Sequence, residues 1–402
     1  MTYKQLRKKY PVFIFDKYSW KRRGKDLIIK FNYSTPPDHN FIHTLVFSNL
    51  DTKNIYSIDN LVFNIGLSEM FSYWKATCSP IIEIQAGYLN SKQIVFWHKL
   101  FIKGMGEYYY KNQIDFTGKN FVKIISSGSI FENCKLKIEN SVLVPLGGGK
   151  DSIVTLEILK KHFKVVPMMI NPTPSMKAIA PKAIVVKRII DPYLLELNTQ
   201  GYLNGHVPLS ACIAFISIIS GCKYVALSNE RSSDENNTEY LGHQINHQYS
   251  KSLEFETDLN NYLKDMSDVK YFSFLRPLYE LQITKLFTRY PQYFKVFTSC
   301  NKNFKIDPSQ HPVGSLWCKT CPKCVSVALL LGKEIATKIM GGYPPEMPEN
   351  KIIMDGLLGI TPVKPFECVL TRDEALGNID MNSWLPNPNM PVEFEKILKS
   401  EL

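Results

Sequence analysis

The stretch S-V-L-V-P-L-G-G-G-K-D-S, residues 141–152, decides the fold that the sequence predicts. Its first six residues are mostly branched and apolar, which is typical of a buried strand, and the apolar run Ile153 to Leu159 indicates a helix. Gly147, Gly148 and Gly149 therefore occupy the turn between strand and helix. Glycines let backbone N–H groups approach a ligand closely, and a helix N-terminus carries partial positive charge. The turn is therefore predicted to bind an anion.

The residues of this turn distinguish between two kinds of phosphate loop. A Walker loop needs Gly-Lys followed directly by Ser or Thr, but Asp151 separates Lys150 from Ser152. The turn instead resembles the pyrophosphate loop S-G-G-x-D-S of the ATP pyrophosphatases, with Gly147 in place of the first Ser. The resemblance implies that the backbone of the three glycines and Ser152 bind the pyrophosphate of ATP, Lys150 neutralises it, and Asp151 helps to hold Mg²⁺. For the loop alone, a glycine-rich turn without a ligand is the alternative.

Composition and charge indicate an ordinary globular protein. The 402 residues are 45% hydrophobic and 21% charged, which suits two or three domains with cores. The basic start M-T-Y-K-Q-L-R-K-K-Y has no apolar segment behind it, so we expect a cytoplasmic protein. The apolar run at 207–222 is short for a membrane span and is predicted to be a buried helix, without membrane insertion. The net charge of +11 is spread along the chain, so no nucleic-acid partner is expected, and the oligomeric state is not predicted.

The order of strand and helix signals predicts an α/β fold in three parts. Residues 1–138 form an N-terminal α+β domain, residues 139–299 alternate strands and helices as a parallel sheet does, and residues 300–402 carry clustered cysteines and a Pro-rich tail. The strands predicted for the middle part are Val142 to Leu146, Val165 to Ile170, Ile184 to Arg188, Tyr224 to Leu227 and Tyr271 to Leu275. The resemblance of the glycine turn implies that this part is the PP-loop type of the adenine-nucleotide α-hydrolase-like fold.

Four cysteines predict a metal centre in the C-terminal part. Cys318, Cys321 and Cys324 lie in W-C-K-T-C-P-K-C, and Cys300 lies upstream in T-S-C-N. Four thiolates at such spacing can saturate tetrahedral Zn²⁺, so we predict a structural zinc site. An iron–sulfur cluster is the main alternative. The chain has nine cysteines, an odd number, and disulfides are not expected in the cytoplasm.

Polar segments at 203–208, 227–236 and 246–256 exceed what a scaffold needs. The second begins where a predicted strand ends, and ligands of open α/β sheets bind beyond the carboxyl ends of strands. Asn229, Glu230 and Arg231 are therefore placed to meet a substrate. Solvated loops and helix caps are the alternative for these segments.

Together these stretches resemble one family, the ATP-dependent epimerases of UDP-N-acetylmuramoyl-L-alanyl-L-glutamate. The resemblance is carried by F-N-I-G-L-S-E-M-F-S-Y-W-K-A-T-C-S-P, P-L-G-G-G-K-D-S, L-N-G-H-V-P, S-N-E-R-S, N-H-Q-Y-S-K-S, S-C-N, W-C-K-T-C-P-K-C and P-F-E-C-V. It implies inversion of the terminal L-Glu of this UDP-muramoyl-peptide, a small-molecule substrate, for peptidoglycan synthesis. It also implies an acyl-adenylate intermediate, release of AMP and pyrophosphate, and the use of ATP, Mg²⁺ and structural Zn²⁺.

The resemblance also suggests roles for side chains. Candidates for the catalytic acid or base are His206, His247 and Glu230, followed by His243 and Cys368. Candidates for substrate binding are Asn204, Asn229, Arg231, Lys251 and Arg276. Two alternatives stay open: another PP-loop adenylating enzyme, acting on a deazaguanine precursor or a tRNA base, and a non-catalytic basic zinc module that binds RNA.

Overall fold

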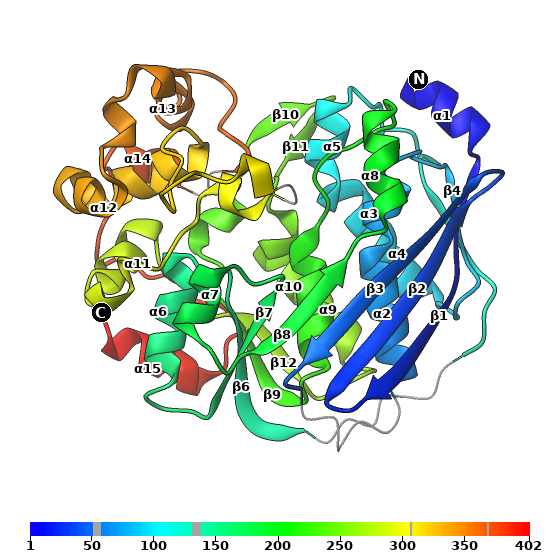
Figure 1. Ribbon diagram of the computed structural model, residues 1–402, viewed down its shortest axis with the longest axis horizontal. Helices are drawn as coiled ribbons and strands as arrows, with labels where there is room; N and C mark the ends of the chain where they lie inside the picture. Colours follow the sequence, from blue (N-terminus) through cyan, green and yellow to red (C-terminus); the bar gives the residue numbers. More distant parts are fainter. Residues whose placement is uncertain (51–57, 131–137, 306–307, 368–369) are drawn as a thin grey trace. The chain divides into compact units, whose positions relative to one another are not determined.

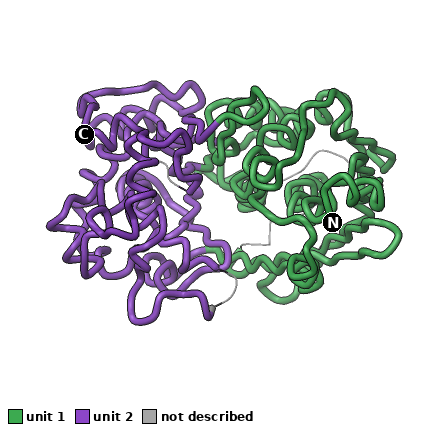
Figure 2. Tube along the Cα trace, turned by 90° about the horizontal axis from the view of Figure 1, so that it is seen from above, with its two compact units in different colours: residues 1–140, 184–225, 239–270 green, residues 141–183, 226–238, 271–402 purple. Residues whose placement is uncertain are grey.

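The computed structural model of this protein describes residues 1–50, 58–130, 138–305, 308–367 and 370–402. Its fold is mixed α/β, and the chain divides into two compact units, each built from separate segments (Figure 2). Unit 1 comprises Met1–Asn140, Ile184–Val225 and Glu239–Lys270, and unit 2 comprises Ser141–Ala183, Ala226–Thr238 and Tyr271–Leu402. The three-domain division made from the sequence stays a prediction.

Unit 1 contains a sheet with the strand order β8-β3-β2-β1-β4-β5. Its strands are β1 (Val12–Arg23), β2 (Asp26–Thr35), β3 (His39–Ser48), β4 (Ile81–Ile84), β5 (Lys123–Ser126) and β8 (Ile184–Ile189). β1, β2 and β3 pair antiparallel and lie side by side in Figure 1, while β4 pairs parallel with β1 and β5. β8 is one of the strands that the sequence predicts, and within this unit it pairs antiparallel with β3.

Buried aromatic residues of β1 and β2 pack against helix α2 (Asp59–Glu69). Gly66 of this helix permits the contact, because a Cβ at Gly66 would lie 2.4 Å from Cζ of Phe15 and 2.7 Å from Cδ1 of Phe31. The Tyr33 hydroxyl donates a hydrogen bond of 2.7 Å to the Gly66 carbonyl. Any larger residue at 66 would therefore separate the helix from the sheet.

The other helices of unit 1 flank the polar segments 203–208 and 246–256. They are α1 (Tyr3–Lys9), α3 (Phe71–Trp74), α4 (Ser91–Gly104), α5 (Gly106–Lys111), α8 (Pro192–Thr199), α9 (Leu209–Ile218) and α10 (Leu253–Leu263). β10 (Thr238–Tyr240) and β11 (His243–Ile245) form a separate two-stranded sheet. α9 arises from the apolar run predicted to be a buried helix, and most of its residues are buried. Within the residues described, no helix has both the length and the apolar character needed to cross a bilayer.

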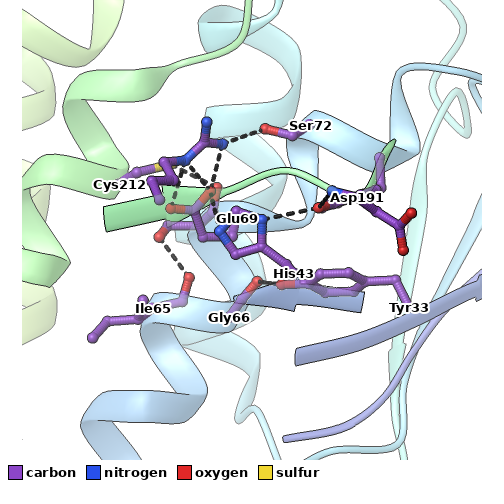
Figure 3. Close-up of polar contacts among 11 residues, drawn as sticks. Tyr33, His43, Ile65, Gly66, Glu69, Ser72, Asp191 and Cys212 are labelled. Carbon is purple, nitrogen blue, oxygen red and sulfur yellow. Dashed lines mark hydrogen bonds and ion pairs between the residues drawn. The ribbon is translucent and has the colours of Figure 1, made fainter. Parts of the chain in front are cut away.

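A buried polar network ties β8, β3 and α2 together in unit 1 (Figure 3). Arg188 of β8 donates two hydrogen bonds to Oε2 of Glu69, at 2.8 and 2.6 Å, and a third to the Ser72 hydroxyl at 2.8 Å. Burial acts to raise the pKa of Glu69, but the Arg188 charge outweighs it and lowers the pKa. His43 of β3 bonds to the Tyr73 hydroxyl at 2.9 Å, and burial lowers its pKa to about 4. His43 is therefore neutral, and the Glu69 charge is matched by Arg188.

Unit 2 is built around strands in the order β12-β9-β6-β7. They are β6 (Glu139–Pro145), β7 (Val165–Ile170), β9 (Cys222–Leu227) and β12 (Lys270–Ser273), with the end of β9 in this unit. β6 and β7 pair parallel, with Val142 opposite Val165. Each of the five strands predicted for the middle of the chain is present, with ends that differ by up to three residues. These strands were predictable because their apolar runs are continuous, as buried strands require.

The helices of unit 2 follow the strands and then fill the C-terminal part. They are α6 (Lys150–Leu159), α7 (Pro174–Ile179), α11 (Glu280–Phe287), α12 (Pro322–Met340), α13 (Lys351–Leu357), α14 (Arg372–Ala375) and α15 (Val392–Ser400). Val325 and Leu330 of α12 share a buried apolar cluster with Leu357 and Leu370. α15 is held by Phe394, whose ring stacks on Phe163 with the centroids 4.5 Å apart.

Candidate active site

The glycine turn of unit 2 joins the end of β6 to the first residue of α6, as predicted. Gly149 is the N-cap of α6 and provides no side chain to bond the free N–H groups of the first turn. Gly148 has a φ of +84°, a conformation that a residue with a side chain rarely adopts. A Cβ at Gly147 would meet no atom within 4 Å. The turn is therefore open at Gly147 and leaves helix N–H groups available to an anion.

Residues just before the cysteine centre pack against this turn. The backbone N–H of Thr298 donates a hydrogen bond of 3.0 Å to the Gly148 carbonyl. A Cβ at Gly149 would lie 2.7 Å from Oγ of Ser299, and one at Gly148 would lie 2.9 Å from Cγ of Met176. Gly148 and Gly149 are thus needed for close approach by two neighbouring segments, and the Ser299 hydroxyl lies at the turn.

Three carboxylates gather beside the turn. Oxygen atoms of Asp151, Glu230 and Glu280 all lie within 4.8 Å of one another. Lys150 is 2% exposed and bonds to both Asp151 and Glu280. Oε1 of Glu280 is buried and has no hydrogen-bond partner among the residues described. One ammonium therefore faces three carboxyl groups, which leaves negative charge to be balanced when all are ionised.

The pKa values of this group reflect that imbalance. Burial and the Asp151 charge raise the pKa of Glu280 well above its usual value, although the Lys150 ammonium opposes the shift. Burial acts to lower the pKa of Lys150, but Asp151 and Glu280 outweigh it and raise the pKa. Lys150 is therefore a fixed cation, while Glu280 resists ionisation unless another positive charge is present.

The cysteine centre lies in the same unit. The Sγ atoms of Cys300, Cys318, Cys321 and Cys324 all lie within 4.8 Å of one another. Sγ of Cys324 is 3.8 Å from Sγ of Cys318 and 3.5 Å from Sγ of Cys321. Tetrahedral zinc with bonds of about 2.3 Å would place its sulfur ligands about 3.8 Å apart. The four side chains could therefore hold a metal ion, which the spacing in the sequence predicts.

Unit 1 contains a second polar cluster, which joins three segments distant in the sequence. Glu107 of α5 accepts a hydrogen bond from Nδ1 of His247. Nδ1 of His206 lies 4.0 Å from Oε2 of Glu107, and the two imidazole centroids are 4.1 Å apart. Lys111 forms an ion pair with the same carboxylate, one helical turn away. The structure thus brings together both histidines that the sequence singles out.

Two glycines allow this convergence. A Cβ at Gly106 would lie 3.3 Å from Cγ2 of Ile245, and one at Gly205 would lie 3.1 Å from Cδ2 of Tyr108. Each glycine precedes a residue of the cluster, Glu107 or His206. Both contacts are tighter than a side chain normally permits, so the glycines let the backbone segments meet.

Burial and neighbouring charges shift the pKa values of Glu107 and His206 in this cluster. Burial acts to raise the pKa of Glu107, but the hydrogen bond and charge of His247 lower it to about 2. Because an ionised carboxylate only accepts hydrogen bonds, Nδ1 of His247 is the donor to Glu107. Burial, followed by the charge of His247, lowers the pKa of His206 to about 3. His206 is therefore neutral near pH 7.

The remaining candidates for substrate binding have partners inside the protein. Asn229 donates to the Ser273 hydroxyl at 2.9 Å. The Arg231 guanidinium donates to Ser383 and to the Pro277 carbonyl at 3.0 Å each. Arg276 is fully buried and lies 2.6 Å from Asp234. The structure thus shows these side chains engaged in unit 2.

The other candidates lie in unit 1, apart from Cys368, which is outside the described residues. Lys251 acts on the pKa of His206 through its charge. Asn204 accepts a hydrogen bond of 2.6 Å from Lys75. His243 is exposed on β11.

Sequence reasoning missed two carboxylates and one lysine. Glu107 follows Gly106 in an aromatic run, Glu280 lies in L-Y-E-L-Q, and Lys75 lies in Y-W-K-A-T. An acidic residue at a buried position of an apolar helix is the signal that could have identified Glu280. No local signal marks Glu107 as part of a site, because both histidine partners come from distant segments.

The fold and these clusters define a class of protein. It is a mixed α/β protein with a glycine turn suited to binding an anion, a four-cysteine centre and a carboxylate–histidine pair suited to proton transfer. The comparisons with known proteins narrow the class. Residues 4–274 match the MurL N-terminal domain, and residues 296–387 match the MurL C-terminal domain. The chain belongs to the MurL family.

Curated relatives cover most of the chain. A protein of Salinispora tropica is 34% identical over 76% of this chain and 69% of its own length. A protein of a Micromonospora species is 35% identical over 76% of this chain and 70% of its own. A protein of Xanthomonas oryzae pv. oryzae is 31% identical over 74% of this chain and 69% of its own. All three are named UDP-N-acetyl-alpha-D-muramoyl-L-alanyl-L-glutamate epimerase, so these relatives are isomerases. No solved structure matches the chain.

Proposed function

We propose that this protein inverts the terminal L-Glu of UDP-N-acetylmuramoyl-L-alanyl-L-glutamate to D-Glu, with ATP as cosubstrate and AMP and pyrophosphate as products. The names of the three relatives support the substrate and the reaction. The structural observation that carries the proposal is the Glu107–His247 pair, because epimerisation requires a group that removes a proton from carbon.

Activation by ATP has a physical reason. Removing the α-proton of a free carboxylate places a second negative charge beside the first, which is unfavourable. Transfer of AMP to the carboxylate oxygen removes the first charge, and pyrophosphate leaves as the Pα–O bond to it breaks. The acyl-adenylate then has a more acidic α-proton. Water hydrolyses it after inversion, so that AMP is released and the carboxylate returns.

The glycine turn of unit 2 suits the nucleotide part of this reaction, in the manner of a PP-loop. The uncapped N–H groups at the start of α6 would bind phosphoryl oxygens, and the Ser299 hydroxyl lies beside Gly149. Lys150 forms ion pairs with two carboxylates, so its charge neutralises this acidic group as well as any bound phosphate.

The acidic group fits Mg²⁺. Asp151, Glu230 and Glu280 would hold the ion, and the unpartnered Oε1 of Glu280 and the excess of carboxylates over ammonium groups support this fit. When bound, Mg²⁺ supplies positive charge that neutralises phosphoryl oxygens. Glu230, a candidate base in the sequence, is assigned here to the ion; its side chain accepts a hydrogen bond of 2.9 Å from Ser233.

The histidine pair of unit 1 suits proton transfer on one face of the substrate. A base must lie about 3 to 3.5 Å from its target, so two bases on opposite faces of Cα stand well apart. His206 and His247 have ring centroids only 4.1 Å apart and cannot flank one carbon. We therefore assign the base to Nε2 of His247, oriented by Glu107, and a hydrogen-bonding role to neutral His206. The donor for the opposite face is a different group.

Incubation of the purified protein with the L-Ala-L-Glu nucleotide, ATP and Mg²⁺ tests the proposal. Chiral analysis of glutamate after acid hydrolysis should show D-Glu, and pyrophosphate should form only when the nucleotide is present. Unchanged stereochemistry would refute the epimerase. Pyrophosphate release that depends instead on a deazaguanine precursor or a tRNA would establish the alternative adenylating enzyme.

We also propose that the four cysteines hold structural Zn²⁺. The sulfur separations support a tetrahedral ion, and the contact of Thr298 with Gly148 implies that the centre helps to hold the glycine turn. Metal analysis of the purified protein should give one zinc per chain, without the visible absorption of an iron–sulfur cluster.

A further inference from the structure

Lys75 lies close to the histidine pair of unit 1 and has no acidic partner among the residues that the structure describes. Its ammonium donates to Oδ1 of Asn204 at 2.6 Å and to the Gly205 carbonyl at 3.1 Å. Both acceptors are neutral and belong to the two residues before His206. An ammonium has three donors, so one remains for a ligand.

The position of this ammonium is fixed by its surroundings. The Tyr108 hydroxyl donates to the Lys75 carbonyl at 2.7 Å, and the Leu203 N–H donates to the Ala76 carbonyl at 3.2 Å. Asn112 donates to the Asn204 carbonyl at 2.9 Å. The Asn204 Oδ1 also accepts the Gly205 N–H at 2.8 Å, so its oxygen is held toward Lys75. Lys75 is thus a held cation rather than a mobile surface chain.

The charge of Lys75 is poorly compensated. Burial, and then the positive charge of Arg188, lowers the pKa of Lys75 to about 8. Lys75 and Lys251 in turn both lower the pKa of His206. A partly buried cation without a carboxylate partner is unfavourable unless an anionic ligand neutralises its charge.

Given the proposed function, we propose that Lys75 binds an oxyanion of the substrate and positions it beside His206 and His247. Two groups of the substrate have the required chemistry: the side-chain carboxylate of the terminal glutamate and the diphosphate of UDP. Either would complete the donor set of Lys75, with Asn204 as the positioning residue that holds the ammonium.

Steady-state kinetics with matched variants test the assignment. Lys75→Met should raise KM about 10- to 100-fold with a smaller change in kcat, because a charge-assisted hydrogen bond is lost. Lys75→Arg should restore most of the affinity. Lys103→Met, which removes a surface lysine paired with Glu254 in the same unit, is the control and should leave both constants unchanged.

Two truncated substrates identify the oxyanion. One carries L-α-aminobutyrate in place of the terminal glutamate, and the other lacks UDP. The truncated substrate that lacks the group bound by Lys75 should have the same affinity for wild type and for Lys75→Met. The truncated substrate that keeps this group should still bind wild type more tightly than Lys75→Met. Binding is measured by calorimetry, so a failure here is distinct from a failure to epimerise. If both truncated substrates lose affinity equally in Lys75→Met, or if the variant binds the full substrate as wild type does, the proposal is wrong.

The pH dependence gives a readout that a structural role would not produce. Only the protonated ammonium attracts an oxyanion, so wild-type affinity should be constant below pH 8 and fall about tenfold per pH unit above it. Lys75→Arg should remove this fall, because arginine stays charged. A fall that persists unchanged in Lys75→Arg would overturn the proposal.

Discussion

The polar clusters of the two units contain similar side chains in opposite proportions. In unit 1, one carboxylate, Glu107, lies with two imidazoles and near Lys75 and Lys251. In unit 2, three carboxylates share one buried ammonium. The excess of positive groups in unit 1 suits an anionic substrate and a neutral His206, whereas the excess of carboxylates in unit 2 suits a divalent cation. Under the proposed function, the balance of charge, more than the residue types, distinguishes the cluster assigned to proton transfer from the cluster assigned to nucleotide activation.

The largest expected effect concerns the metal centre of unit 2. Cys324→Ser should abolish zinc binding and unfold the C-terminal part of this unit, because structural zinc contributes on the order of 10 kcal/mol of binding free energy. Metal content, circular dichroism and limited proteolysis measure the loss. Cys212→Ala removes a buried cysteine of unit 1 and should retain the metal. Full metal content in Cys324→Ser would remove the zinc assignment.

The second effect tests the acidic group of unit 2. Asp151→Asn should reduce pyrophosphate release about a thousandfold, since loss of a carboxylate weakens charge stabilisation by several kcal/mol. Raising the Mg²⁺ concentration should recover part of the rate. Asp373→Asn, on the exposed face of α14, is the matched control and should behave as wild type. If Asp151→Asn keeps the wild-type rate and Mg²⁺ dependence, the group does not hold the ion.

The third effect tests the histidine pair of unit 1. His247→Gln should slow inversion about 10²- to 10³-fold, because the base is lost. NMR in D₂O measures the exchange of the substrate α-proton. In His247→Gln this exchange should stop for one epimer of the substrate and continue for the other. This asymmetry follows from the proposal that both imidazoles, whose centroids are 4.1 Å apart, serve one face of the substrate. His98→Gln on α4 is the control. Equal loss of exchange for both epimers would show that the pair serves both faces.

The comparison also shows how much the sequence could predict. The glycine turn, strand β7 (Val165–Ile170) and the cysteine centre were predictable because each depends on residues close together in the chain. Glu107 was not, because its role arises only where α5 meets two segments more than ninety residues away, through contacts at Gly106 and Gly205.

Charged residues with internal partners were equally hard to interpret. Arg276 follows a strand end, as a substrate-binding residue would, yet it lies fully buried against Asp234. The antiparallel pairing of β8 with β3 also depends on a strand that is far away in sequence. Pattern predicts what a segment is, whereas its partner is set by long-range packing.

The smallest expected effect is a pH dependence of the free energy of unfolding, which arises from His206 in unit 1. His206 has its pKa lowered from 6.5 to about 3 by burial, with contributions from His247, Lys251 and Lys75 and with Glu107 opposing. The unfolded chain therefore binds a proton below pH 6.5 that the folded chain does not. The stabilisation is complete above pH 6.5 and is lost as the pH falls, by at most about 1.4 kcal/mol per pH unit. The lowered pKa of Glu107 also stabilises the folded protein, and this contribution is lost only as the pH falls below 4.5, the usual pKa of a glutamate.

His43, whose pKa is lowered to about 4 by burial, contributes a slope of the same sign between pH 4.5 and 6.5. Urea unfolding in this window therefore isolates His206 only through the difference between wild type and a His206 variant. The free energy of unfolding should fall less steeply with acidification in His206→Asn than in wild type. The acidic cluster of unit 2 gives no such slope through a histidine, because it contains none. Equal slopes in wild type and His206→Asn would mean that His206 accepts a proton in the folded protein. It would then be a second base beside His247, and the assignment of a single base to this cluster would fall.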